Sequence, residues 1–312
     1  ISLIIMLGIA ATTFYALTMH QDSGVETQFR DFLETNRVGY GTNDEYNYRL
    51  GVFEANLQRI DELNRANPEA TFAVNMFADR TQQEMERLMG FHAPGKRVVN
   101  HKYTGDHKDI DWTNMWSAIK NQGQCGSCWA FSAAAAFEAR YALENGSKTV
   151  TTLFSEQELV DCDPQSDGCN GGFMDYAFEY LQDNGFCTED QYPYTARDGT
   201  CKADSLCGSG PKDKAFTDIP EGDEDGMLDE LLNGPISVAV DASSWSFYDS
   251  GIMDSCGSGL NHGVTLVASN SGEGWARLRN SWGGSWGESG HIRIKLNQDT
   301  CGYADVASYP TF

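Results

Sequence analysis

The alternation of hydrophobic and polar positions divides residues 108–312 into a helical part and a later, strand-rich part. Periodicity close to that of an α-helix predicts three helices, at residues 129–143, 155–161 and 174–183. From about Asp218 onward, short alternating or apolar runs predict strands at 236–240, 263–267, 276–279 and 291–295. The order indicates an α+β fold with two lobes, 108–217 and 218–312.

The preceding part of the chain has a different pattern. Residues 45–89 show helical periodicity within a stretch that carries charges of both signs and no cysteine. Residues 91–107 contain proline, glycine and several basic side chains, which indicates a polar linker and processing region. Residues 1–19 contain no charged side chain and predict the apolar core of a secretory signal peptide, 1–20. A membrane anchor is the alternative, although threonines dilute the apolar run.

Charge and cysteine content narrow the class of protein. The formal net charge is −23, which argues against nucleic acid as a partner because nucleic acid binding needs basic surfaces. The chain has 9 cysteines, all between Cys125 and Cys301. An odd number in an oxidising compartment predicts four disulfides and one free thiol. Zinc binding is a weaker alternative because residues 108–312 contain few histidines.

Cys128 is the strongest candidate for a catalytic group. It lies at the start of the helix predicted at 129–143, behind Ser127, which can cap that helix, and Asn145 with Gly146 stops the helix. Unpaired backbone N–H groups and the helix dipole are expected to lower the pKa of a thiol at this position. The sequence therefore predicts a nucleophilic thiolate.

The motif around Cys128, Cys-Gly-Ser-Cys-Trp, is the local signature of papain and cathepsin proteases, which have His and Asn roughly 130 to 150 residues downstream. His262 and Asn280 lie at this spacing. From about residue 25 to Phe312 the chain resembles a cathepsin L-like cysteine protease of the papain family. The resemblance implies a papain-like fold, with a helical lobe, a β-barrel-like lobe and an N-terminal helical propeptide at 21–107.

The resemblance also implies a role for each residue of the active site. Cys128 is the expected nucleophile, His262 the general acid and base, and Asn280 the residue that orients the imidazole. Trp282 is expected to cover the bond between His262 and Asn280, and Gln122 to donate its amide to the oxyanion. The implied reaction is endopeptidase cleavage through a thioester, without cofactor or metal.

Substrate binding is likewise implied by the resemblance. Gly171 and Gly172 are expected to bind extended substrate backbone. The side-chain pocket is expected to be apolar and to prefer Leu, Phe or Val, rather than Arg, at the second residue before the cut. Its expected lining residues are Phe173, Met174, Ala239, Leu260 and Val306.

The family resemblance assigns three disulfides, Cys125–Cys169, Cys162–Cys201 and Cys256–Cys301, and leaves Cys128 free. The remaining pair resembles an additional bridge of the plasmodial falcipains, so we expect Cys187–Cys207. Spacing alone leaves open the alternative of Cys187 with Cys201 and Cys162 with Cys207.

Two motifs support the propeptide. One set matches the interspersed helix motif of cathepsin L-type propeptides: Glu45, Arg49, Phe53, Asn56, Ile60 and Asn64. Residues 73–79 match the second propeptide motif, except that Ala73 replaces the usual glycine. The resemblance implies that this segment lies along the cleft and inhibits the enzyme. Acid is expected to release it by loosening carboxylate contacts, such as those of Asp79 or Glu45.

The expected partners are protein or peptide substrates, the propeptide itself and cystatin-type inhibitors. We expect a monomer without membrane contact in its mature form, located in a lysosome, a vacuole or the medium. Two rival functions remain to be weighed. Cys125 and Cys128 form a Cys-x-x-Cys pattern, which could indicate an oxidoreductase, and a papain-like fold could also serve as a non-catalytic binder.

Overall fold

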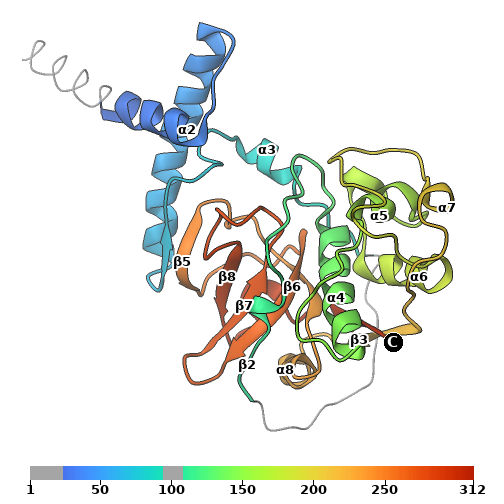
Figure 1. The fold of residues 1–312 in the computed structure, drawn as a ribbon. Helices are drawn as coiled ribbons and strands as arrows, with labels where there is room; N and C mark the ends of the chain where they lie inside the picture. Colours follow the sequence, from blue (N-terminus) through green and yellow to red (C-terminus); the bar gives the residue numbers. More distant parts are fainter. Residues whose placement is uncertain (1–23, 94–107) are drawn as a thin grey trace, which may run out of the picture.

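The computed structural model describes residues 24–93 and 108–312. They form an N-terminal helical segment, a lobe rich in helices and a lobe built on a mixed β-sheet (Figure 1). The predicted signal peptide and most of the predicted linker at 91–107 lie outside the described residues. In the described part of the chain, every helix is too short or too polar to cross a lipid bilayer.

The N-terminal segment is organised by helix α2 (Asn43–Ala66), which packs against a helix formed by residues 24–36 (Figure 1). Aromatic side chains fill the contact. Phe29 and Phe32 both pack against Phe53 of α2, with ring centroids 5.2 and 5.4 Å from it. Phe53 is fully buried, so one apolar stripe of α2 holds the helix pair together.

Helical structure ends earlier than the periodicity of residues 45–89 predicts. After Pro68 the chain forms strand β1 (Ala70–Phe72) and then the short helix α3 (Gln82–Glu86). The residue before a proline is disfavoured in the α conformation, and Asn67 has φ −126° and ψ 80°. Pro68 therefore ends α2, and the rest of the segment is free to pair with the sheet.

The helical lobe surrounds helix α4, which is buried along most of its length. Small alanine side chains on α4 allow the neighbouring elements to approach it closely. The three helices predicted here are confirmed to within one residue at each end. The lobe contains η1 (Thr113–Met115), α4 (Cys128–Glu144), α5 (Glu156–Cys162), η2 (Gly168–Asn170), α6 (Met174–Asn184) and α7 (Ala203–Leu206).

The second lobe is a mixed sheet in the order β1-β5-β8-β7-β6-β4-β9-β3, with β2 paired to β6. Neighbouring strands are antiparallel except β5 and β8. The four predicted strands are present, although β6 is longer than expected because its end pairs with β2 and β7. The elements are β2 (Ile110–Asp111), β3 (Ala215–Ile219), α8 (Glu224–Leu231), β4 (Ile236–Val240), β5 (Tyr248–Met253), β6 (His262–Asn270), β7 (Trp275–Arg279), β8 (His291–Lys295), η3 (Thr300–Gly302) and β9 (Ala307–Thr311).

Helix α4 joins the two lobes. The Ser132 hydroxyl donates to the Val264 carbonyl oxygen at 2.6 Å, and the Ser237 hydroxyl donates to the Ser132 carbonyl oxygen at 3.0 Å. These buried bonds fix α4 against β6 and β4. The first residue of α4 and the first residue of β6 consequently meet at the junction of the lobes.

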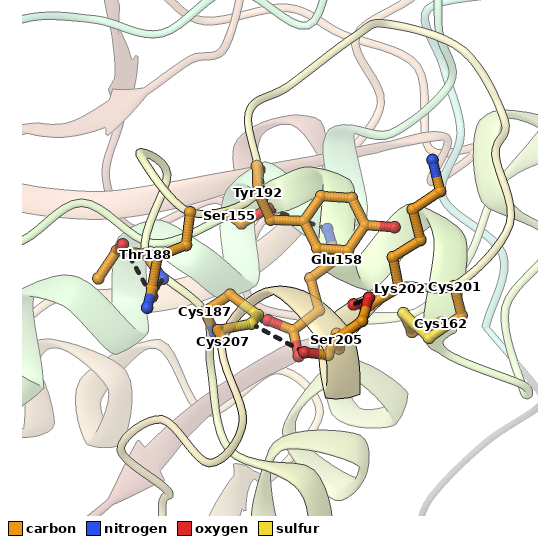
Figure 2. Close-up of a disulfide and its surroundings, with 12 residues drawn as sticks. Ser155, Glu158, Cys162, Cys187, Thr188, Tyr192, Cys201, Lys202, Ser205 and Cys207 are labelled. Carbon is orange, nitrogen blue, oxygen red and sulfur yellow. Dashed lines mark hydrogen bonds between the residues drawn. A yellow bond between two sulfur atoms is a disulfide. The ribbon is translucent and has the colours of Figure 1, made fainter.

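The structure contains the four expected disulfides, including the pair whose assignment sequence spacing left open. Cys187 is bonded to Cys207 across 20 residues, so the alternative pairing is excluded (Figure 2). Cys128 is the free cysteine of the described chain. The bridges are Cys125–Cys169, Cys162–Cys201, Cys187–Cys207 and Cys256–Cys301.

Candidate active site

Cys128 begins α4 and its side chain is fully buried. Strand β6 approaches it so closely that a Cβ atom at Gly263 would lie 3.2 Å from the Cys128 carbonyl oxygen. The Gly90 backbone N–H donates to Cys128 Sγ at 3.2 Å. The thiol therefore lies where the helical lobe, the sheet lobe and the N-terminal segment meet.

Ser127 occupies the N-cap position of α4, but its side chain does not cap the helix. Its φ and ψ are −100° and 18°, outside the extended region from which a capping hydroxyl reaches the first turn. The Ser127 hydroxyl lies 2.6 Å from the Tyr194 hydroxyl instead. The predicted cap is therefore wrong, and the predicted stop at Asn145 and Gly146 is confirmed by the end of α4.

His262 and Asn280 form a buried hydrogen-bonded pair. His262 is the first residue of β6 and Asn280 follows β7, which brings His262 Nε2 within 2.8 Å of Asn280 Oδ1. An amide oxygen can only accept, so Nε2 carries the proton and Nδ1 presents a lone pair. Nδ1 has no hydrogen-bond partner among the described residues. The Trp282 ring lies 5.0 Å from the imidazole and is itself buried, which excludes water from the pair.

Gln122 is held by two bonds to Ser281 on the other lobe. The Ser281 hydroxyl donates to Gln122 Oε1 at 2.6 Å, and the Gln122 backbone N–H donates to the Ser281 carbonyl oxygen at 2.8 Å. Gln122 Nε2 donates to the carbonyl oxygens of Leu88 and Cys125, both at 2.9 Å. One amide proton thus points to a carbonyl group of the N-terminal segment.

Burial keeps both reactive groups neutral in this structure. Burial raises the pKa of the Cys128 thiol to about 11, although backbone N–H groups, first that of Gly263 and then that of Gly90, oppose the shift. Burial lowers the pKa of His262 to about 4, against the opposing bond to Asn280. The expected low thiol pKa is therefore wrong for the covered site, because desolvation outweighs the helix N-terminus.

Residues 88–92 cross the site after a turn at Arg87 and Leu88, and Phe91 pairs there with the helical lobe. Phe91 forms a parallel bridge with Gly172: the Gly172 N–H donates to the Gly90 carbonyl oxygen, and the His92 N–H donates to the Gly172 carbonyl oxygen, both at 2.9 Å. The His92 ring lies over Gly171, where a Cβ atom would be 2.2 Å from it. Both glycines predicted to bind substrate backbone thus contact this segment.

The five predicted pocket residues lie in one hydrophobic cluster that also contains Phe91. The Phe91 ring meets the Phe173 ring edge to face, with centroids 5.7 Å apart, and Phe91 is almost fully buried. Its backbone N–H donates to the Asn261 carbonyl oxygen at 3.0 Å. Phe91 therefore packs against Phe173, and both belong to the same apolar cluster as the other four residues predicted to line the pocket, Met174, Ala239, Leu260 and Val306.

The N-terminal segment is stabilised by polar contacts of the predicted helix motif. Arg49 forms a two-pronged ion pair with Glu84 at 2.7 and 2.8 Å and also binds Glu45 at 2.8 Å. Asn56 donates to the carbonyl oxygens of Ala78 and Arg80. Arg49 holds the pKa of Glu84 at about 2, below its usual range, through their hydrogen bonds. These contacts tie α2 to the chain that leads into the cleft.

The second predicted motif docks this segment on the sheet lobe. Strand β1 extends the sheet by pairing with β5, and Asn75 donates to the Ser246 carbonyl oxygen at 2.8 Å. The Phe77 ring packs edge-on against Trp282 at 5.5 Å. Ala73, where glycine was expected, still donates its N–H to Phe247 at 2.9 Å. Trp282 therefore contacts both the N-terminal segment, through Phe77, and the active site, through His262.

Sequence analysis missed several residues that contribute to the site. Glu84 is the main partner of Arg49, while Leu88, Gly90 and Asn261 supply backbone groups around the thiol and its pocket. A capping box between Thr81 and Glu84 could have indicated helix α3 but not its partner. The backbone contacts leave no mark in residue type, except for the glycine at position 90.

The Cys187–Cys207 disulfide lies beside Glu158, and these three groups could be mistaken for a metal site. Glu158 and the sulfur atoms of Cys187 and Cys207 lie within 4.8 Å of one another (Figure 2). The sulfurs are bonded to each other and are not thiolates, and Glu158 accepts the Cys187 N–H at 2.6 Å. The carboxylate therefore anchors the bridge. The Cys125–Cys169 bridge likewise removes Cys125 as the partner that a redox motif needs.

Comparison with known proteins agrees with this arrangement. Residues 107–311 match the sequence model of the papain family cysteine proteases, and residues 29–85 match the cathepsin propeptide inhibitor domain. "Cathepsin L 2" of Paramecium tetraurelia is 42% identical over 292 residues, covering 89% of this chain and 90% of the relative. "Procathepsin L" of Mus musculus is 36% identical over 336 residues and 99% of both chains.

Solved structures show the same relationship. The digestive procathepsin L 3 of Tenebrio molitor larval midgut superposes with a TM-score of 0.81 at 34% identity, covering 92% of this chain and 99% of that chain. The buried thiol, the lobe junction and the covering segment define the precursor of a thiol-dependent hydrolase. The chain belongs to the papain family of cysteine proteases, as a cathepsin L-like precursor with its own inhibitory propeptide.

Proposed function

We propose that the mature enzyme is an endopeptidase in which Cys128 is the nucleophile and His262 carries the proton. His262 Nδ1 accepts the thiol proton, the sulfur attacks the peptide carbonyl carbon, and the imidazolium protonates the leaving amine. Water then attacks the thioester, with His262 as the base, and releases the acid and the free thiol. Asn280 keeps Nε2 protonated throughout, so that Nδ1 is the atom that accepts.

The observation that best supports this proposal is the contact of Gln122 with Leu88. A side-chain amide donates at 2.9 Å to the peptide carbonyl oxygen of Leu88, two residues before Gly90, whose N–H contacts the thiol. A substrate carbonyl at the same amide would develop its negative charge against that donor and against the backbone N–H of Cys128. Loss of one donor of this kind typically lowers the rate by about 10²- to 10³-fold.

Latency follows from the chemistry of the covered site. The propeptide excludes water, and burial alone holds the thiol and imidazole in their neutral forms. Departure of residues 88–92 would expose both groups and restore the conditions under which an ion pair lowers a thiol pKa. We place the propeptide at residues 21–107 and the mature enzyme at 108–312.

We also infer a preference for an apolar side chain at the second position before the cut. The packing of Phe91 against Phe173, within the cluster that contains the proposed pocket residues, supports this preference, and Val306 would supply no carboxylate there. A substrate with Leu, Phe or Val at this position would replace Phe91 without leaving a buried charge unpaired.

Two variants test the nucleophile. Cys128→Ala should yield a stable precursor that does not mature, and peptidase activity in it would exclude this mechanism. A thiol-directed epoxide should label the activated enzyme once, and Cys128→Ser should block the labelling. Absence of labelling in the wild-type protein after removal of the propeptide would favour a non-catalytic binder.

The four disulfides support a route through the secretory pathway to a lysosome, a vacuole or the medium. Protein or peptide substrates are the proposed partners of the open cleft, and cystatin-type inhibitors would compete for it. We propose a monomer as the working unit, since one chain supplies the whole site.

A further inference from the structure

One face of the β7–β8 strand pair is strongly cationic in a protein whose formal net charge is −23. Arg277 pairs in register with Arg293, and Arg279 with His291. Residues in direct register, and those two apart on one strand, point to the same side of a sheet. Four side chains that carry or can carry positive charge therefore share this face.

A groove of about 490 Å³ lies over part of this face. Arg277, Arg279 and His291 line it on the sheet side, and residues 113–119 form the opposite wall. That wall contains no titratable side chain. The groove is distinct from the cleft around Cys128, although Arg279 directly precedes Asn280.

The negative charge within the groove is already engaged. Glu288 lines the groove, but its two oxygens accept from Arg293, with Arg293 Nε at 2.8 and 3.0 Å. Arg277 reaches Glu288 only at 3.8 Å and Asp111 at 3.6 Å. No described carboxylate lies within 4.0 Å of the buried Arg279, which donates to the Ala118 carbonyl oxygen at 2.6 Å.

Two nitrogens in the groove lack partners. His291 is 5% exposed, and its Nδ1 lies 3.1 Å from the Ser289 carbonyl oxygen, so Nδ1 is the donor. His291 Nε2 and Arg277 Nε are buried without a hydrogen-bond partner in the described chain. Buried polar groups are nearly always hydrogen-bonded, so these two nitrogens are available to a polar ligand in the groove.

We propose that this groove binds a free tetrahedral oxyanion, such as inorganic sulfate, between Arg277, Arg279 and His291. The two guanidinium groups donate charge-assisted hydrogen bonds to its oxygens. His291 takes up a proton on Nε2 and becomes the third donor while Nδ1 keeps its bond to Ser289. Binding of the anion is therefore coupled to binding of one proton.

The coupling makes affinity depend on pH. In the empty groove, burial and then the charges of Arg279 and Arg277 lower the pKa of His291 to about 4. The other charged groups that face it are Glu288, paired with Arg293, and Asp111 beyond Arg277. A bound dianion opposes the two arginines, raises the pKa of His291 and binds more tightly as the pH falls. Sulfate keeps its charge over this range, so the protein alone sets the dependence.

Calorimetric titration of the full-length Cys128→Ala precursor with sodium sulfate tests the proposal, with sodium chloride added to hold the ionic strength constant. We expect saturable binding to one site, tighter at about pH 5 than at about pH 7. Arg277→Gln should weaken binding by about tenfold or more, because one charge-assisted bond is lost. His291→Gln should remove the pH dependence. Arg59→Gln, a matched change on an exposed helix surface, should change neither the affinity for sulfate nor its dependence on pH.

Three results would overturn the proposal: no saturable heat, the same response with chloride alone, or equal weakening by Arg59→Gln and Arg277→Gln. Arg277→Lys keeps the positive charge but removes Nε. It replaces Arg277→Gln in the titration if Arg277→Gln lowers the thermal midpoint of the precursor. If Arg277→Lys binds sulfate as tightly as the wild type, Nε does not contact the anion and the assigned site is wrong.

Discussion

Substitution of Gly90 by alanine should displace the propeptide segment from Cys128 without changing the sequence of the mature enzyme. A Cβ atom at position 90 would lie 1.7 Å from the Gly126 carbonyl oxygen and 2.4 Å from its carbonyl carbon. Gly126 cannot retreat, because its N–H donates to Cys169 at 2.9 Å and its neighbour Cys125 is held by a disulfide to Cys169. The propeptide segment must therefore lift away from the thiol.

The cost can be worked from the bonds that the lifted segment loses. They are the Gly90 N–H to Cys128 Sγ, the Gly172 N–H to the Gly90 carbonyl oxygen and the Gln122 amide to the Leu88 carbonyl oxygen. At about 0.5–1.5 kcal/mol each, three bonds amount to roughly 1.5–4.5 kcal/mol. The open fraction of the precursor should rise roughly 10- to 1,600-fold, since about 1.4 kcal/mol corresponds to a factor of ten.

The rate at which a thiol-directed epoxide labels Cys128 at neutral pH measures that open fraction. Gly51→Ala is the matched control: position 51 is exposed on α2 with nothing within 4 Å of an added Cβ. Alanine should stabilise the helix there, by about 1 kcal/mol, and should not speed labelling. Labelling of Gly90→Ala at the wild-type rate, with circular dichroism confirming its fold, would refute the reasoning.

Three further predictions concern the propeptide and the pocket. Glu84→Gln should lower the thermal midpoint of the precursor at about pH 5 to 7, and the difference should vanish as the pH falls towards about 2, where Glu84 itself is protonated. Asp79→Asn mimics the protonated acid and should shift maturation towards neutral pH; an unchanged pH profile of processing would contradict this. Val306→Glu should allow cleavage of peptides with Arg at the second position before the cut. If kinetics with a peptide library show that Arg is still rejected there, Val306 does not line the pocket.

Local patterns were enough to predict helices α4, α5 and α6 and strands β4, β6, β7 and β8, but not the remaining elements of the two lobes. Helix α4 and strands β4 and β8 follow directly from the periodicity and from the stop at Asn145. Strand β1 could not be predicted in the same way, because three residues have no period of their own and form a strand only by pairing with β5. The end of α2 could have been predicted, since Pro68 is visible in the sequence.

The chemistry of the site was predicted less completely than its residues. Gln122, Cys128, His262 and Asn280 lie together at the lobe junction, as their spacing implied. The state of the thiol was mispredicted because the segment that covers it, which includes Gly90, is 38 residues away in sequence. A local motif reports the helix that begins at a cysteine, but not the segment that covers it.

A count of protons restricts how acid can release the propeptide. In the closed precursor Cys128 and His262 are neutral, with one proton on the sulfur and one on Nε2; in the proposed ion pair of the open enzyme the number is the same, because the sulfur proton has moved to Nδ1. Opening therefore takes up no proton at this pair between about pH 4 and pH 8, and the pair supplies no pH dependence there. Glu84 supplies none while it stays bound to Arg49, because its pKa of about 2 keeps it ionised. Separation of Glu84 from Arg49 returns its pKa towards the usual value, so opening that breaks this ion pair takes up a proton below about pH 5. The other carboxylate contacts of the segment are those of Asp79, which accepts from the Tyr40 hydroxyl, and of Glu69, which is ion-paired with Lys295 of β8.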